Sequence, residues 1–116
     1  MKICLELDGK NLPATLNDSA AARDLAALLP LTLTLKDYAA TEKISDLPRR
    51  LSTSAAPAGT KPSSGDIAFY APWGNLAIFY RSADYAAGLI KLGQLDDGVA
   101  ELRGAGPLNV TITACD

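Results

Sequence analysis

The chain of 116 residues contains no histidine. This absence excludes Ser-His-Asp and Cys-His nucleophilic catalysis, and it removes the side chain that most often acts as a general base near neutral pH. His-ligated zinc is excluded as well, and Cys4 and Cys115 alone cannot supply the four thiolates of a structural zinc site. The sequence therefore predicts no metal site and none of these catalytic centres.

Clustered positive charge and long apolar runs are also missing. The net charge is −2, and Arg49 and Arg50 form the only adjacent basic pair. Nucleic-acid binding depends on clustered Lys and Arg, so we expect no nucleic-acid partner. No uncharged apolar run reaches the length of a membrane span, and the first residues alternate like a strand instead of forming the apolar region of a signal peptide. We therefore expect a cytoplasmic protein without membrane contact.

Two further patterns argue against special chemistry. Gly104 and Gly106 lack the third glycine and the following helix of a dinucleotide site, so we expect no cofactor. Cys4 and Cys115 lie in the first and last predicted strands, which bring the two thiols close if those strands pair. A cytoplasmic setting nevertheless disfavours a stable disulfide between them.

Short alternating apolar segments, separated by Gly, Pro and Asn, predict seven or eight strands and two helices. The pattern indicates one domain over residues 1–116, without the strand-helix-strand alternation that a parallel sheet requires. We expect a mainly β closed barrel with a helix at each end. Residues 45–48 can open a single helical turn, and the Ser, Ala and Pro-rich segment 52–64 is typical of a flexible loop. The predicted strands are residues 3–7, 12–16, 31–36, 67–70, 76–80, 88–94 and 108–113, and the predicted helices are residues 18–29 and 96–102.

The segment from Gly65 to Tyr80 concentrates the aromatic residues of the chain. It holds the only Trp, both Phe and two of the four Tyr. Two strands joined by a tight Pro-Trp-Gly-Asn connection fit this pattern. Both faces of these strands carry apolar groups, so we expect central strands with one face on the core and the other covered or lining a groove.

The same segment resembles the signature of small bacterial and archaeal cyclophilin-like proteins. The resemblance rests on Gly-Asp-Ile-Ala at residues 65–68, Pro-x-Gly-Asn at 72–75 and Ile-Phe at 78–79. Residues 31–35, 46–49 and 91–95 and the closing Val-Thr-Ile-x-x-Cys extend it over nearly the whole length. The resemblance implies a closed barrel of about eight mostly antiparallel strands with a helix capping each end.

The activity of true cyclophilins does not follow from this resemblance. They are peptidyl-prolyl isomerases that use an Arg beside a groove lined by Phe, Met, Gln, Trp and His. This chain has no His, its only Met is the initiator, and it matches neither the Phe-His-Arg segment nor the Gln-containing strand of that family. Some similar proteins look fused to flavodoxin-like domains, which implies an accessory role.

Five residues are the candidates for a ligand groove. Trp73 can stack on a proline ring or a flat ligand, although it can equally pack over an open end of the barrel. Tyr70 and Phe79 flank it and otherwise belong to the barrel wall. Asn75 follows the turn and otherwise stabilises it. Arg49, chosen by its match to the family, can donate to a carbonyl or carboxylate and is otherwise a surface charge.

These residues lead to three hypotheses. The first is a non-catalytic module whose groove binds an extended peptide or a small ligand, with residues 52–64 as a flexible rim. The second is a divergent prolyl isomerase with Arg49 as the donor, since this reaction needs only a desolvated groove and one donor. The third is an accessory or assembly partner of a flavodoxin-like redox protein. The oligomeric state stays open.

Overall fold

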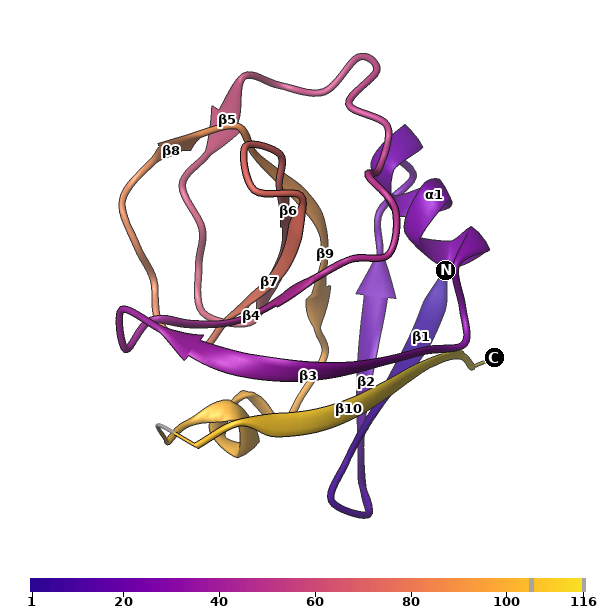
Figure 1. The fold of residues 1–116 in the computed structure, drawn as a ribbon, viewed down its shortest axis with the longest axis vertical. Coiled ribbons are helices and arrows are strands. Elements are labelled where there is room, and N and C mark those ends of the chain that lie inside the picture. The colour runs from indigo at the N-terminus through magenta and orange to yellow at the C-terminus, as the bar shows by residue number, and fades with distance from the viewer. Residues whose placement is uncertain (105, 116) are drawn as a thin grey trace.

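In a computed structural model of the chain, which describes residues 1–104 and 106–115, eight antiparallel strands close into a barrel (Figure 1). The order around the barrel is β1-β10-β3-β4-β7-β6-β9-β2, and β2 pairs with β1. A separate two-stranded ribbon joins β5 (Gly59–Thr60) to β8 (Ala86–Ala87). The mainly β closed barrel is confirmed. Its strands are β1 (Lys2–Leu7), β2 (Lys10–Leu16), β3 (Leu31–Tyr38), β4 (Glu42–Asp46), β6 (Asp66–Tyr70), β7 (Asn75–Phe79), β9 (Leu89–Leu95) and β10 (Leu108–Ala114).

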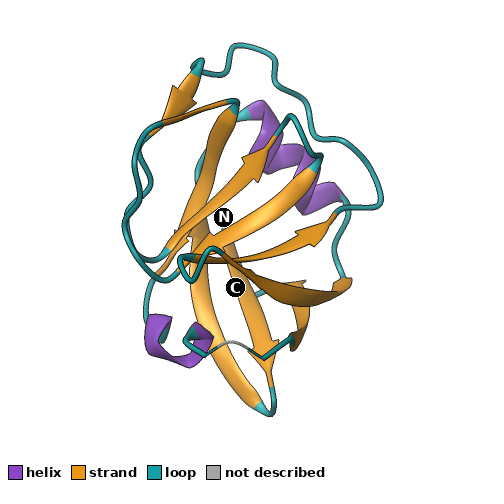
Figure 2. Cartoon of the chain, turned by 60° about the vertical axis from the view of Figure 1, so that its left-hand side comes forward, coloured by secondary structure: helices purple, strands orange, loops and turns teal. Residues whose placement is uncertain are grey.

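Two helical segments lie at opposite ends of the barrel (Figure 2). The α-helix α1 (Ala20–Ala27) begins after Ser19, whose side chain accepts a hydrogen bond from the Ala22 N–H at 3.1 Å. The second segment, η1 (Val99–Leu102), is a single 3-10 turn, so the expected α-helix at that end is corrected. None of the helices in the described residues is both long and apolar enough to cross a membrane.

The core follows from the two-residue period of the strands. Inward side chains from every barrel strand except β4 form one apolar cluster, which includes Ile3, Phe69 and Tyr80. Leu25 of α1 and Leu102 of η1 are fully buried in the same cluster and close it from two sides. Each such side chain contributes about 1.5–3 kcal/mol by its removal from water. The helices therefore serve the barrel as covers for its core.

The strands β6 and β7 are buried on both faces, as the sequence predicted. Ile67 and Phe69 point into the core, whereas Ala68, Ala77 and Phe79 belong to a second apolar cluster on the outside of the barrel. Segments around the β5–β8 ribbon pack against this outer cluster. The barrel wall is thus covered by a second layer at this place.

The β3–β4 hairpin corrects the prediction of a helical turn at residues 45–48. Residues Glu42–Asp46 form β4, which pairs with β3 on one side and β7 on the other. The connection runs through Ala39 and Ala40, with left-handed φ values of 54° and 53°. Glycine or asparagine normally marks such positions. Two alanines give no such signal, so the hairpin was not predicted.

A disulfide joins Cys4 to Cys115, with their Cα atoms 5.7 Å apart. The sequence disfavoured a stable disulfide on the ground of a cytoplasmic setting, and the structure corrects this expectation. Pairing of β1 with β10 places Cys115, the residue that follows β10, beside Cys4 of β1, although 111 positions separate them in the sequence. Disulfides persist mainly in oxidising compartments, so this bond lends no support to the predicted cytoplasmic location.

Reduction of the Cys4–Cys115 disulfide is expected to lower the Tm while leaving the barrel folded at room temperature. A cross-link over this separation restricts the unfolded chain and typically adds about 2–4 kcal/mol to the free energy of unfolding. Thermal unfolding followed by circular dichroism, with and without dithiothreitol, measures the effect. The C4S/C115S double variant is the control, because dithiothreitol should not change its Tm. Equal Tm values for the oxidised and reduced wild type would contradict the prediction.

Candidate functional site

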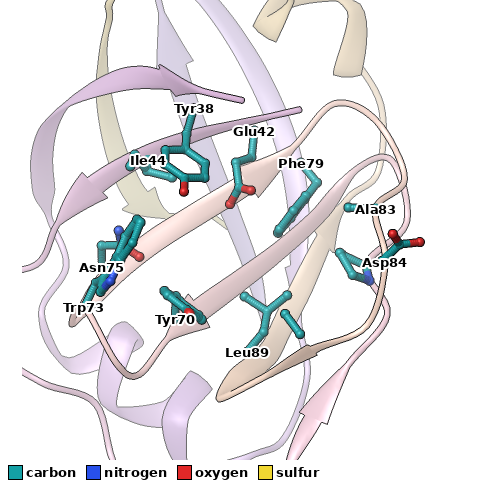
Figure 3. Close-up of a pocket in the computed structure, with 12 residues that line it drawn as sticks. Tyr38, Glu42, Ile44, Tyr70, Trp73, Asn75, Phe79, Ala83, Asp84 and Leu89 are labelled. Atoms are coloured by element: carbon teal, nitrogen blue, oxygen red, sulfur yellow. The ribbon is translucent and has the colours of Figure 1, made fainter. Parts of the chain in front are cut away.

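A pocket of about 240 Å³ opens on the outer wall of the barrel, over β4, β6 and β7 (Figure 3). Its side chains come from five barrel strands, from the turn between β6 and β7, and from β8 and the segments next to the β5–β8 ribbon, which form its far side. The lining residues are Tyr38, Glu42, Ile44, Pro62, Tyr70, Trp73, Asn75, Phe79, Ala83, Asp84, Ala86 and Leu89.

Strand register places these side chains on one face. Glu42 lies opposite Phe79 across the β4–β7 pair, and Tyr70 lies opposite both Asn75 and Leu89. Side chains at paired positions point to the same side of a sheet. The floor of the pocket is therefore the outward row of four neighbouring strands, formed by the same alternation that fills the core.

Trp73 forms one wall of the pocket. It lies in the connection at residues 71–74, where Gly74 has a φ of 67° and donates its N–H to the Tyr70 carbonyl at 2.9 Å. Its ring meets the rings of Tyr38 and Tyr70 edge-on, with centroids 5.3 and 5.2 Å away. The side chain stays 53% exposed. Trp73 therefore lines the pocket on the outer wall of the barrel.

Glu42 is the acidic group of the pocket. In Figure 3 its carboxylate and the Tyr38 hydroxyl point toward the middle of the pocket. Burial beside these apolar side chains raises the pKa of the Glu42 carboxyl to about 7. Within the described parts of the chain, no Lys or Arg forms an ion pair with it. A carboxylate in this setting lacks the counter-charge that normally accompanies a buried acid.

Asn75 contributes a second acceptor. Its side chain is only 3% exposed, and among the described residues its Oδ1 atom has no hydrogen-bond partner. Buried polar atoms nearly always have a partner, so an orphaned acceptor that lines a pocket is a sign of a missing donor. Asp84 adds an exposed carboxylate at the rim. In residues 1–104 and 106–115, no three His, Cys, Asp or Glu side chains gather as a metal site would require.

On the opposite face of β4, the positive charge of Lys43 is compensated by nearby acceptors. Lys43 is fully buried, and its ammonium donates to the Gly104 carbonyl and to the Gly106 carbonyl at 3.0 Å. Its Nζ lies 3.5 Å from the Asp37 carboxylate, which also accepts a hydrogen bond from the Tyr80 hydroxyl. The Tyr80 hydroxyl, with Lys43 as a further cause, holds the pKa of Asp37 below its usual value. These groups satisfy one another inside the barrel, unlike Glu42 outside it.

Four of the five predicted site residues meet at the pocket, and one does not. Tyr70, Trp73, Asn75 and Phe79 line it together. Arg49 lines a separate depression beside α1. Its neighbour Arg50 donates to the Ala71 carbonyl in the turn that carries Trp73.

Sequence reasoning missed the residues contributed by distant segments. Tyr38 continues the outward-facing positions of the strand predicted at residues 31–36, so its place on the outer face could have been predicted from the alternation. Glu42 belongs to β4, which the sequence did not predict. Asp84 reaches the pocket because the chain after β7 folds back over the outer wall, and Leu89 reaches it because β9 pairs with β6. No pattern in the local sequence predicts that this segment packs over the barrel wall.

The fold and the pocket define a small closed-barrel protein with a pocket on its outer wall. A model of the cyclophilin-like family matches residues 5–113, and the chain belongs to this family. The solution structure of the hypothetical protein AF2241 from Archaeoglobus fulgidus is similar, with a TM-score of 0.68 and 14% sequence identity over 99% of this chain and 95% of that chain. At this identity the likeness concerns the fold alone. A comparison with curated proteins found no match.

Glu42→Gln is expected to raise the Tm at pH 8 and to leave it nearly unchanged at pH 5. The folded-state pKa of about 7 lies above the ordinary value of 4.5. The stability linked to this carboxyl is therefore fully present below about pH 4.5 and is lost as the pH rises through 7. After allowance for partial exposure, we expect a gain of about 1 kcal/mol at pH 8, or roughly 4 °C.

Thermal unfolding at the two pH values measures this difference. The matched control is Glu6→Gln, which removes a carboxylate exposed on the outer face of β1. The control should show no such dependence on pH. An effect of Glu42→Gln that is the same at pH 5 and pH 8 would show that the pKa of Glu42 is not raised.

Proposed function

We propose that this protein is a binding module whose outer pocket holds part of an extended peptide or a small ligand. The observation that carries the proposal is the gathering of Tyr38, Tyr70 and Trp73 around a pocket with two acceptors, the Glu42 carboxylate and Asn75 Oδ1, that have no partner among the described residues. Pockets that bind ligands combine apolar and aromatic walls with a few placed polar groups. This pocket has that composition.

The size of the pocket supports a modest ligand. Its volume of about 240 Å³ lies below the range of about 300–1,000 Å³ that is typical for drug-sized molecules. One amino-acid side chain or a small molecule fits such a space. The exposed Trp73 supports the proposal further, because large aromatic side chains left in water often belong to interaction sites.

Prolyl isomerisation remains the alternative function, with less support. It needs a hydrogen-bond donor that stabilises the twisted amide. The described lining offers neutral donors such as the Tyr38 hydroxyl and the Trp73 indole N–H, but no Lys or Arg, and Arg49, the donor expected from the sequence, lies in another depression. A role as partner of a flavodoxin-like protein remains a prediction, because no contact or surface described above favours it.

Titration of the ¹⁵N-labelled protein with a pool of short peptides, proline-containing ones included, tests the binding module. We expect saturable shifts of the Trp73 indole N–H resonance and of the Tyr70 and Asn75 amides. Trp73→Ala should weaken binding by about tenfold or more, because it removes a wall of the pocket. Thr32→Ala, exposed on β3, is the control and should bind like the wild type. Absence of shifts with every peptide would overturn an extended peptide as the ligand of this pocket.

A protease-coupled assay of prolyl isomerisation separates the two functions. The binding module predicts no acceleration above the uncatalysed rate. Acceleration that Trp73→Ala abolishes would favour the isomerase instead. In that case Arg49→Ala should leave the rate unchanged, since Arg49 does not line the pocket; a loss of rate would reinstate Arg49 as the donor.

A further inference from the structure

The pocket offers negative charge and acceptors without a positive charge of its own. Glu42 supplies a carboxylate, Asp84 supplies another at the rim, and the buried Oδ1 of Asn75 lacks a donor among the described residues. No Lys or Arg belongs to the described lining. Electrostatic complementarity favours a ligand that carries positive charge and N–H donors.

The cations on neighbouring segments do not supply the missing charge. Lys43 follows Glu42 directly, but it points into the barrel and is held by Gly106 and Asp37. Lys61 and Arg81 flank segments of the lining, yet both are exposed and neither is part of it. The carboxylate of Glu42 therefore faces a pocket that a ligand has to complete.

The aromatic walls suit a cation as well. Tyr38, Tyr70, Trp73 and Phe79 all line the same small space. Their rings attract a cation that comes within about 6 Å of the ring centre, which adds to the attraction of a carboxylate. The apolar floor of Ile44 and Leu89 meanwhile suits an aliphatic chain.

The positions of the two acceptors indicate how the donors of the ligand are arranged. Glu42 pairs with Phe79, four residues along β7 from Asn75. This spacing corresponds to about 13 Å between Cα atoms. Glu42 and Asn75 therefore project from positions near opposite ends of β7, and two acceptors placed in this way suit two donors of one ligand. A lysine residue in a peptide has such donors, the side-chain ammonium and the backbone N–H.

We propose that the pocket binds the side chain of a lysine presented by an extended peptide, with the ammonium at Glu42, the aliphatic chain against Phe79 and Leu89, and a backbone N–H donating to Asn75. This inference rests on the proposed binding function and names its ligand class. Only non-covalent contacts are involved.

A comparison of three ligands on the unchanged protein tests the inference at pH 8. The ligands are a blocked tripeptide with central lysine, the same peptide with norleucine, and pentylammonium. Trp73 fluorescence and the Trp73 indole resonance report binding. We expect the lysine peptide to bind at least about tenfold more tightly than the norleucine peptide, which has the same aliphatic chain without the charge. It should also bind more tightly than pentylammonium, which lacks the amide N–H.

Variants assign the two contacts separately. Glu42→Gln should remove the preference for lysine over norleucine, whereas the control Glu6→Gln should retain it. Asn75→Leu should weaken both peptides alike, because the proposed Asn75 contact is to the backbone. Circular dichroism establishes that each variant is folded before it is titrated. A lysine preference that survives Glu42→Gln would overturn the role of Glu42.

The outcomes distinguish this inference from the proposed function. Equal binding of the lysine and norleucine peptides would overturn the inference and leave the binding module in place. If pentylammonium binds as tightly as the lysine peptide, the pocket recognises an alkylammonium group and the proposed contact with a peptide backbone is wrong. If neither tripeptide binds while other peptides of the pool do, the inference is wrong and the proposed function stands. If no peptide binds at all, both the inference and the peptide form of the proposed function are wrong.

Discussion

Pairing between β1 and β10 closes the sheet, and the other features of the structure depend on this closure. An open sheet of eight strands would leave two edges with unpaired backbone groups. Closure removes the edges and turns the inward side chains of the strands into one core. It also brings the first and last segments of the chain together, which places Cys4 beside Cys115. The disulfide thus reinforces the same seam that the backbone hydrogen bonds form.

A closed barrel normally leaves its outer face to water, and this one departs from that pattern over β6 and β7. The segments on either side of the β5–β8 ribbon fold back over the outward side chains of these strands. They form a second apolar layer that is not filled completely. The pocket is the unfilled part of this layer. Outward side chains of the barrel strands therefore form its floor, and aromatic side chains form its walls. The candidate site is therefore a consequence of how the covering segments pack on the barrel wall.

The charges on β4 show how one strand serves both layers. Glu42 and Lys43 are neighbours in sequence, and the period of two sends them to opposite faces. Inside the barrel, Lys43 finds carbonyl groups and Asp37, so its charge is compensated. Outside, Glu42 lines the pocket with tyrosine, phenylalanine and isoleucine and has no ion-pair partner among the described residues, and burial raises the pKa of its carboxyl. A charge left uncompensated by the fold is available for a ligand, and this contrast underlies the proposed lysine site.

The sequence by itself determined the barrel, the hairpin of β6 and β7, and the placing of Tyr70, Trp73, Asn75 and Phe79 at one site. These features follow from alternation along a strand and from a glycine turn, and both act between residues close in the chain. Tertiary structure alone decided that Cys4 meets Cys115, that Arg50 contacts the Trp73 turn while Arg49 lies apart, and that Glu42 enters the pocket. These contacts join distant segments, and one depends on a turn that Ala39 and Ala40 form without the usual signal. The free energy that favours these contacts comes from the packing and closure of the whole barrel, and it cannot be predicted from the local sequence.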